Sequence, residues 1–167
     1  QSGIQVVPVY LGDDIATAPR AEYQKRRGLG GLLFTLKIGG AAAEAGSPLA
    51  EVTRLMEKSN QRTATLAVAV RAPEHPATGQ VLFELPKGEI EIGTGVHGEM
   101  GVYRGPYLPA DQIVDMLVER LVTDLEAFAG RKMLVFINGA GGTSKMELHI
   151  LYRRAHQALT QRGYEVA

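Results

Sequence analysis

The spacing of apolar residues predicts four helices along this chain. Their expected ranges are 29–45, 47–60, 111–128 and 143–161. In the third range apolar residues recur every four positions and therefore share one helix face. They are Ile113, Leu117, Leu121 and Leu125. The first range is built from small residues and contains Gly39 and Gly40, each of which costs a helix about 1 kcal/mol relative to Ala. We expect close packing against another backbone to account for both glycines.

The ends of the predicted helices carry residues that favour capping. Gly46 suits the C-terminus of the first helix, while Ser47 and Pro48 favour the N-cap and the first turn of the second. Ser144 and Glu147 have the spacing of a capping box, in which each side chain bonds the backbone N–H of the other residue. These residues predict helix starts at 47–48 and at 144.

Runs of β-branched and alternating apolar residues predict strands between the helices. The expected ranges are 4–10, 63–70, 81–85, 89–92, 132–137 and 163–166. Successive side chains of a strand point to opposite faces of its sheet. In the fourth of these runs we therefore expect Ile90 and Ile92 to point inward and Glu89 and Glu91 to point outward.

Helices and strands are mixed in order without an internal repeat, which predicts an α/β fold. In detail we expect an α+β sandwich, with one mixed β-sheet and helices packed against it. Residues 18–27 and 71–80 are polar or contain Pro and Gly, and are predicted to be surface loops. The length of 167 residues fits a single domain, residues 1–167. Because the chain lacks an initiator Met and enters a strand-like run almost at once, we expect it to be the later part of a longer protein.

Charge and composition exclude several function classes. The 18 Lys and Arg balance the 18 Asp and Glu, whereas general nucleic-acid and anionic-membrane binders carry an excess of basic residues. The absence of Cys excludes disulfides, thiolate metal sites and cysteine nucleophiles. The chain has no run of about 20 apolar residues, the length that a membrane helix needs. The N-terminus also lacks the pattern of a signal peptide. We therefore expect a cytoplasmic protein with neither nucleic acid nor membrane as a partner.

The densest candidate chemistry follows the predicted strand 89–92. Gly95, His97, Gly98 and Glu99 lie there in a segment that contains a literal GxGxxG. A dinucleotide fingerprint must open a helix, and the residues that follow are poor helix formers, so this match is weak. The glycines leave the imidazole uncovered, and Glu99 could accept the proton of one ring nitrogen. The other nitrogen would then be available as a base, a ligand or a nucleophile; the alternative is a tight structural turn.

Other polar residues are weaker candidates. Residues 138–144 form a Gly-rich turn before a predicted helix, which is either a cap or an anion site, and they lack the GK[ST] of a P-loop. Asp13 and Asp14 fit a turn better than a cation site, because no third carboxylate stands at ligand spacing. The remaining histidines are expected to be surface or satisfied core residues: His75, His149 and His156.

Around His97 the sequence resembles the substrate-binding subunit of dihydroxyacetone kinases. The shared pattern is a strand followed by G-[IV]-H-G-E-x-G, which begins here at Gly95. Further stretches similar to the family occur in family order at 12–16, 26–31, 37–46, 83–85 and 138–143. The resemblance covers nearly the whole chain and is therefore more specific than any single motif.

This resemblance implies a covalent role for His97. Its imidazole would add to the carbonyl of dihydroxyacetone or another short-chain ketose and form a hemiaminal, with Gly95, Gly98 and Glu99 beside the substrate. A separate nucleotide-bearing kinase domain or a phosphotransferase subunit would then phosphorylate a hydroxyl of the held ketose. ATP or ADP with Mg²⁺ is accordingly expected on that partner, and neither a cofactor nor a metal site in this chain. The family also implies a homodimer.

The sequence departs from the family at single positions, of which Met100 is one, and in its extent. Met100 stands where many members have Pro. The family's earlier half, which supplies acid–base groups to the pocket, is missing from these 167 residues, so the chain would be a half-site that needs its N-terminal half as a partner. Two alternatives stay open: a non-catalytic ketose-sensing or regulatory module of the same fold, and an interaction domain in which His97 is only a turn.

Overall fold

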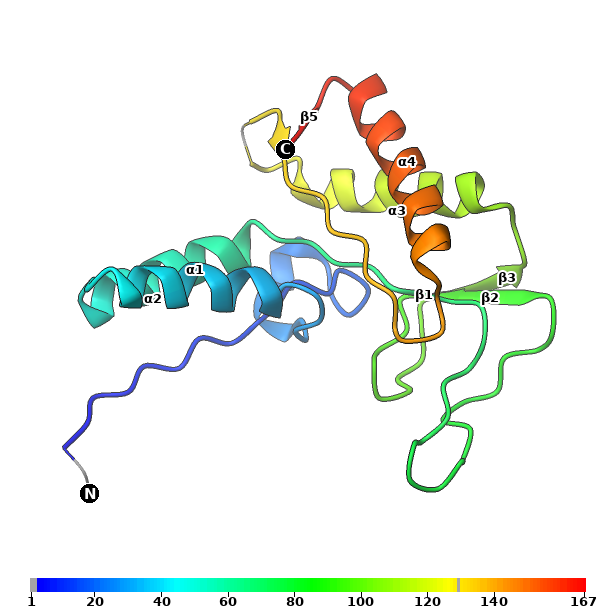
Figure 1. The fold of residues 1–167 in the computed structure, drawn as a ribbon, viewed down its shortest axis with the longest axis horizontal. Coiled ribbons are helices and arrows are strands. Elements are labelled where there is room, and N and C mark those ends of the chain that lie inside the picture. Colours follow the sequence, from blue (N-terminus) through cyan, green and yellow to red (C-terminus); the bar gives the residue numbers. More distant parts are fainter. Residues whose placement is uncertain (1–2, 129) are drawn as a thin grey trace. The chain divides into compact units, whose positions relative to one another are not determined.

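The computed structural model describes residues 3–128 and 130–167. Contacts between Cα atoms divide the chain into two compact units, the first ending at Thr65 and the second running over Leu66–Ala167. Helices and short strands are mixed along the sequence, as an α/β fold requires (Figure 1). The prediction that residues 1–167 form a single domain stays a prediction.

The first unit is built on two helices that lie side by side, α1 (Leu32–Glu44) and α2 (Leu49–Gln61) (Figure 1). A Cβ placed on Gly39 would lie 2.6 Å from Met56 Sδ, so close packing explains this glycine, although the neighbour is a side chain and not the expected backbone. A Cβ on Gly40 would meet nothing within 4 Å. The expected contact with another backbone is therefore found at neither glycine among the described residues: Gly39 packs on a side chain, and Gly40 faces open space.

The link between these helices differs from prediction at one cap. Gly46 ends α1 as expected, with a φ of +79° that suits glycine. The N–H of Ser47 donates back to the Ala42 carbonyl at 3.0 Å, so Ser47 completes the end of α1 and caps nothing in α2. Pro48 is the N-cap of α2, and its carbonyl accepts the N–H of Val52 at 3.1 Å.

The start of α1 is held by buried carboxylates. Asp13 and Asp14 have no exposed surface. Asp13 accepts the Gly31 N–H at 2.7 Å and the Thr65 hydroxyl at 2.5 Å, while Asp14 accepts the Arg27 Nε–H at 2.6 Å. A buried carboxylate needs such partners because burial without them is costly. Both aspartates therefore serve the structure of this unit, in line with the turn interpretation.

Two predictions for the first unit are wrong. Residues 4–10 form no strand, since no described residue makes a backbone ladder with them, and Ile4, Val6 and Tyr10 are 75%, 79% and 83% exposed. A β-branched run becomes a strand only where a second strand satisfies its N–H and C=O groups. The predicted loop 18–27 contains a 3₁₀ helix, η1 (Arg20–Lys25).

The described residues of the second unit form two small sheets where one mixed sheet was predicted. The first is antiparallel in the order β1-β2-β3, and the second pairs β4 with β5 in parallel. Their bounds are β1 Val68–Ala69, β2 Glu89–Ile92, β3 Tyr103–Pro106, β4 Lys132–Met133 and β5 Glu165–Val166. The predicted strands 63–70 and 132–137 are cut to two residues each, and 81–85 contributes only an isolated bridge. The prediction of a single sheet is therefore wrong.

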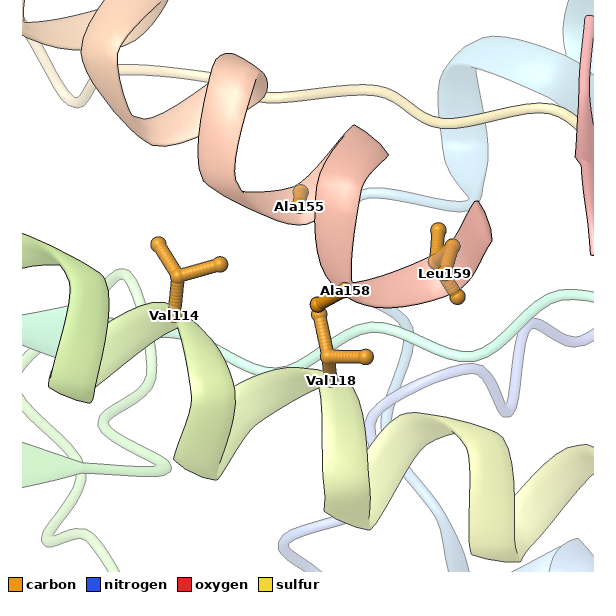
Figure 2. Packing of buried hydrophobic residues seen from close by; sticks show 5 residues of the cluster. All are labelled: Val114, Val118, Ala155, Ala158 and Leu159. Atoms are coloured by element: carbon orange, nitrogen blue, oxygen red, sulfur yellow. The ribbon is translucent and has the colours of Figure 1, made fainter. Parts of the chain in front are cut away.

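The core of this unit lies between α3 (Ala110–Leu125) and α4 (Lys145–Gln161), which Figure 2 shows at close range. The buried residues of this cluster are Val114, Val118, Ala155, Ala158 and Leu159. Small alanines on α4 let the valines of α3 approach its backbone closely. The predicted capping box at the start of α4 is confirmed, since Ser144 and Glu147 bond each other's backbone N–H.

Candidate active site

A loop between β2 and β3, residues 93–101, carries the cluster around His97. At its start the Gly93 N–H donates to the Ala67 carbonyl at 2.8 Å, with a φ of +87° at this glycine. Directly after the loop, the Val102 N–H donates to the Ile92 carbonyl, also at 2.8 Å. The loop therefore leaves and returns at the end of the central strand, with the histidine at its tip. Because the segment leads into β3 and not into a helix, it lacks the helix N-terminus that a dinucleotide fingerprint requires.

The tip of this loop is a tight turn that needs glycine. The Gly95 N–H donates to the Glu99 carbonyl at 3.1 Å, and the Gly98 N–H donates to the Gly95 carbonyl at 3.4 Å. Gly98 has a φ of +90°, and a Cβ there would lie 2.8 Å from Leu82 Cβ. A side chain at this position would therefore be strained in conformation and short of space.

The turn presents the imidazole of His97 to solvent. This side chain is 84% exposed, and its Nδ1 lies 3.5 Å from Glu99 Oε1. The other carboxylate oxygen of Glu99 accepts the backbone N–H of His97 at 2.9 Å. One carboxylate thus holds the backbone of the turn and faces Nδ1 of the ring, which leaves Nε2 on the side away from Glu99. The structure brings the four predicted site residues into one turn; their role stays a prediction.

Sequence reasoning did not single out Glu91, a buried carboxylate on the strand that leads into this loop. Strand alternation predicts that it points outward, but its side chain is 3% exposed. Its Oε1 accepts the Gly101 N–H at 2.6 Å, and its Oε2 accepts the Arg104 Nε–H at 2.7 Å. Burial by itself raises the pKa of Glu91, but the Gly101 N–H and the Arg104 guanidinium outweigh burial and hold the pKa below the ordinary value of 4.5. Arg104 stands directly opposite Glu91 on β3, a pairing that only the strand register reveals.

The weaker candidates do not join this cluster. His75, His149 and His156 are all exposed, which confirms their interpretation as surface residues. The turn 138–144 precedes the capping box of α4. A shallow depression is lined by residues of the segments 71–74 and 81–86, and His97 is not among them. In residues 3–128 and 130–167, no three His, Asp or Glu side chains gather in a way that would hold a metal ion. No helix in the described part of the chain has the length and apolar character needed to cross a membrane.

Comparison with known proteins gives a match over the whole length. The family model described as Dak1 domain matches residues 1–167. The chain is 38% identical over 98% of its length to the dihydroxyacetone-binding subunit DhaK of PTS-dependent dihydroxyacetone kinase 2 from Listeria innocua, of which it covers 49%. It is 39% identical, again over 98% of its length, to L-erythrulose kinase of Pectobacterium atrosepticum, of which it covers 28%. The chain therefore spans half or less of each of these relatives.

Solved structures give the same fold. The dihydroxyacetone kinase operon co-activator Dha-DhaQ superimposes with a TM-score of 0.87 at 28% identity, over 98% of this chain and 51% of that one. The dihydroxyacetone kinase of C. freundii superimposes with a TM-score of 0.74 at 29% identity, over 91% of this chain and 27% of that one. The predicted α/β fold class is thereby confirmed.

Proposed function

This chain belongs to the Dak1 domain family, and on that premise we propose that it is the substrate-holding part of a kinase for dihydroxyacetone or a related short-chain ketose. Its membership also confirms the resemblance to the dihydroxyacetone kinase family seen in the sequence. The observation that supports the proposal is the exposed imidazole of His97, held at the tip of a glycine turn beside Glu99. Relatives named for dihydroxyacetone and for erythrulose point to small hydroxyketones as the substrate class.

We propose that His97 binds the ketose through a covalent bond. The lone pair of Nε2 attacks the carbonyl carbon, and the π electrons of the C=O bond move to oxygen, which takes up a proton. Nδ1 loses its proton in exchange, to Glu99 or to water. The sum is the addition of N–H across C=O, so a hemiaminal forms and no group leaves. Glu99 supports this step because a carboxylate 3.5 Å from Nδ1 favours the tautomer with its proton there and the lone pair on Nε2.

A covalent bond suits a very small substrate. Dihydroxyacetone offers little apolar area, so non-covalent contacts alone would hold it weakly. A bond to the carbonyl carbon fixes the hydroxyls for phosphoryl transfer and selects ketones over polyols such as glycerol, which have no carbonyl. In this proposal Gly95 and Gly98 contribute by keeping side chains away from the ring.

Phosphoryl transfer is assigned to a partner. The nucleotide, expected as ATP or ADP with Mg²⁺, would be held by a separate kinase domain or subunit, or a phosphotransferase protein would supply the phosphoryl group. The comparison with a C. freundii dihydroxyacetone kinase described in complex with AMP-PNP and Mg²⁺ supports this division, since this chain covers only 28% of that protein. Assembly as a homodimer and with an N-terminal half likewise remains part of the proposal.

The test is direct detection of the adduct. The intact protein that contains this chain is mixed with ¹³C-labelled dihydroxyacetone and examined by NMR and by native mass spectrometry. We expect the carbonyl carbon signal to move to that of a tetrahedral carbon, and the protein mass to rise by the full mass of the ketone without loss of water. Glycerol, which cannot form a hemiaminal, should give no adduct.

Two variants make this test specific. His97→Ala should abolish the adduct, while His75→Ala, which removes another exposed histidine of the same unit, should leave it unchanged. An adduct that persists in His97→Ala, or a wild-type protein that forms none, would overturn the proposed role of His97.

A regulatory function is the second candidate. A solved structure that covers 98% of this chain at a TM-score of 0.87 is described as an operon co-activator, and another is described as regulation of the dha operon of Lactococcus lactis. The same ketose-holding turn would then report the presence of substrate to a transcription factor. Adduct formation is common to both candidates, so phosphoryl transfer must separate them.

A further inference from the structure

Glu91 is a charged residue in the interior of the sheet that carries the His97 loop. It lies on β2, the middle strand, with Ala69 of β1 on one side and Arg104 of β3 on the other. Its side chain is 3% exposed, while that of Arg104 is 39% exposed. A buried carboxylate is stable only when both oxygens have strong partners. Glu91 is buried on the middle strand, so, unlike a surface Glu, it is not explained by contact with water.

The partners of Glu91 lie at the base of the loop. Oε1 accepts the Gly101 N–H at 2.6 Å, and Oε2 accepts both Nε–H and Nη2–H of the Arg104 guanidinium. Gly101 is the last residue of the loop, and Arg104 lies three residues further along the chain. The carboxylate thus joins the end of the loop to the strand that the loop enters.

The backbone packs so closely at Gly101 that no side chain would fit there. A Cβ at this position would overlap the Ile92 carbonyl oxygen and would lie 2.8 Å from Glu91 Cγ. The returning chain is therefore pressed directly onto the strand that it left, and the charge-assisted bond from Gly101 holds it there. At the other end of the loop the Gly93 N–H is fixed by the Ala67 carbonyl. His97 lies midway between these two anchors.

We propose that Glu91 is a positioning residue for His97, an inference that rests on the proposed role of that histidine. By binding Gly101 and Arg104 together, Glu91 fixes the end of the loop and so sets where the imidazole stands relative to a bound ketone. Glu91 does not itself touch the ring in this arrangement. The lowered pKa of Glu91 agrees with a carboxylate that stays ionised in the folded protein.

The test compares Glu91→Gln with the matched control Glu89→Gln in the intact protein. In Gln an NH₂ group replaces one carboxylate oxygen, so a donor would face either the Gly101 N–H or the Arg104 guanidinium. Glu89 is on the same strand, and the structure shows no bond from it to Gly101 or Arg104. Both variants are examined at a temperature where they are fully folded. The readouts are the imidazole NMR signals of His97 without ketone and the equilibrium constant of the ketone adduct.

We expect Glu91→Gln to shift the His97 signals and to weaken the adduct about 10- to 100-fold, since small errors of position cost that much in a reaction between held groups. Glu89→Gln should change neither readout. A purely structural role would lower the melting temperature of Glu91→Gln and leave both readouts of the folded protein unchanged. That result, or equal weakening in Glu89→Gln, would overturn the positioning role.

The test still gives an answer if Glu91→Gln does not fold or if the wild-type protein forms no adduct. If Glu91→Gln does not fold, Arg104→Lys decides, because it keeps Glu91 and the positive charge but removes the fork that grips the carboxylate. If Arg104→Lys shifts the His97 signals and weakens the adduct relative to wild type, the inference is supported. If both readouts stay at their wild-type values, it is refuted. If the wild-type protein forms no adduct, the proposed function fails, while the His97 signals of the free protein still show whether Glu91 sets the position of the ring.

Discussion

At the scale of single residues, the Glu91 carboxylate makes the free energy of unfolding of the second unit depend on pH. Its pKa in the folded protein lies below the ordinary 4.5, so the folded state binds this proton less readily than the unfolded state does. The stabilisation is therefore complete above the ordinary pKa and is lost as pH falls through the lowered one.

This sign gives a measurable prediction. At neutral pH, wild type should melt at a higher temperature than Glu91→Gln, and the gap should narrow as the pH falls below 4.5. Melting temperatures measured by circular dichroism from about pH 7 to about pH 3 test it, with Glu89→Gln as the control whose gap to wild type should not follow this course. A gap that is constant over the whole range would show that the charge of Glu91 contributes nothing.

The sequence alone predicts His97 as a candidate site residue but does not single out Glu91, for a physical reason. The histidine is marked by adjacent glycines and by a carboxylate two positions away, so its whole setting is local in the chain. The role proposed for Glu91 depends on Arg104, which is brought opposite to it only by the register of two strands. Because side chains alternate along a strand, Glu91 between two buried isoleucines is expected on the solvent face. Nothing in the sequence of β2 indicates that its side chain is buried.

At the scale of elements, Gly39 and Gly40 of α1 offer a matched pair. Alanine favours a helix over glycine by about 1 kcal/mol at either position. A Cβ on Gly40 meets open space, whereas one on Gly39 would lie 2.6 Å from Met56 Sδ and 2.7 Å from its Cγ. Overpacking of this kind costs about 1–3 kcal/mol, which equals or exceeds the gain.

Gly40→Ala should therefore raise the melting temperature by about 2–4 °C, the shift expected from 1 kcal/mol in a chain of this size. Gly39→Ala should leave it unchanged or lower it. Thermal unfolding of the two variants beside wild type measures both effects. Equal gains in the two variants would mean that Met56 moves aside freely and that the packing of α1 on α2 is loose.

The helices were predictable and most strands were not. Periodicity and caps place the four α-helices of the described residues within a few positions, because a helix satisfies its hydrogen bonds locally. Strand pairing depends on distant residues, so runs such as 81–85 have the right composition but no described partner for a ladder. Glu89–Ile92 is predicted correctly because its alternation coincides with two neighbours that do pair with it, β1 and β3.

At the scale of the whole molecule, the fold and the turn that carries His97 are compatible with either of the two proposed functions. Solved structures similar to this chain include a kinase and an operon co-activator, at 29% and 28% identity. A fold hosts different functions, so the decision rests on what the complete assembly does with a bound ketone. If the chain serves a kinase, the proposed His97 adduct would be an intermediate on the way to a phosphate ester. If it serves a regulator, the adduct would be the end point.

Phosphoryl transfer in an extract separates these functions. An extract of cells that lack only this protein is given labelled dihydroxyacetone, with ATP and Mg²⁺ or with phosphoenolpyruvate as the phosphoryl source. If the chain serves a kinase, added wild-type protein and His75→Ala should restore formation of the ketose phosphate, and His97→Ala should not. The phosphoryl source that supports the reaction then identifies the class of partner. If the unsupplemented extract forms the ester at the wild-type rate, while transcript levels respond to dihydroxyacetone only in cells that have His97, the kinase proposal is refuted and the regulatory function is correct.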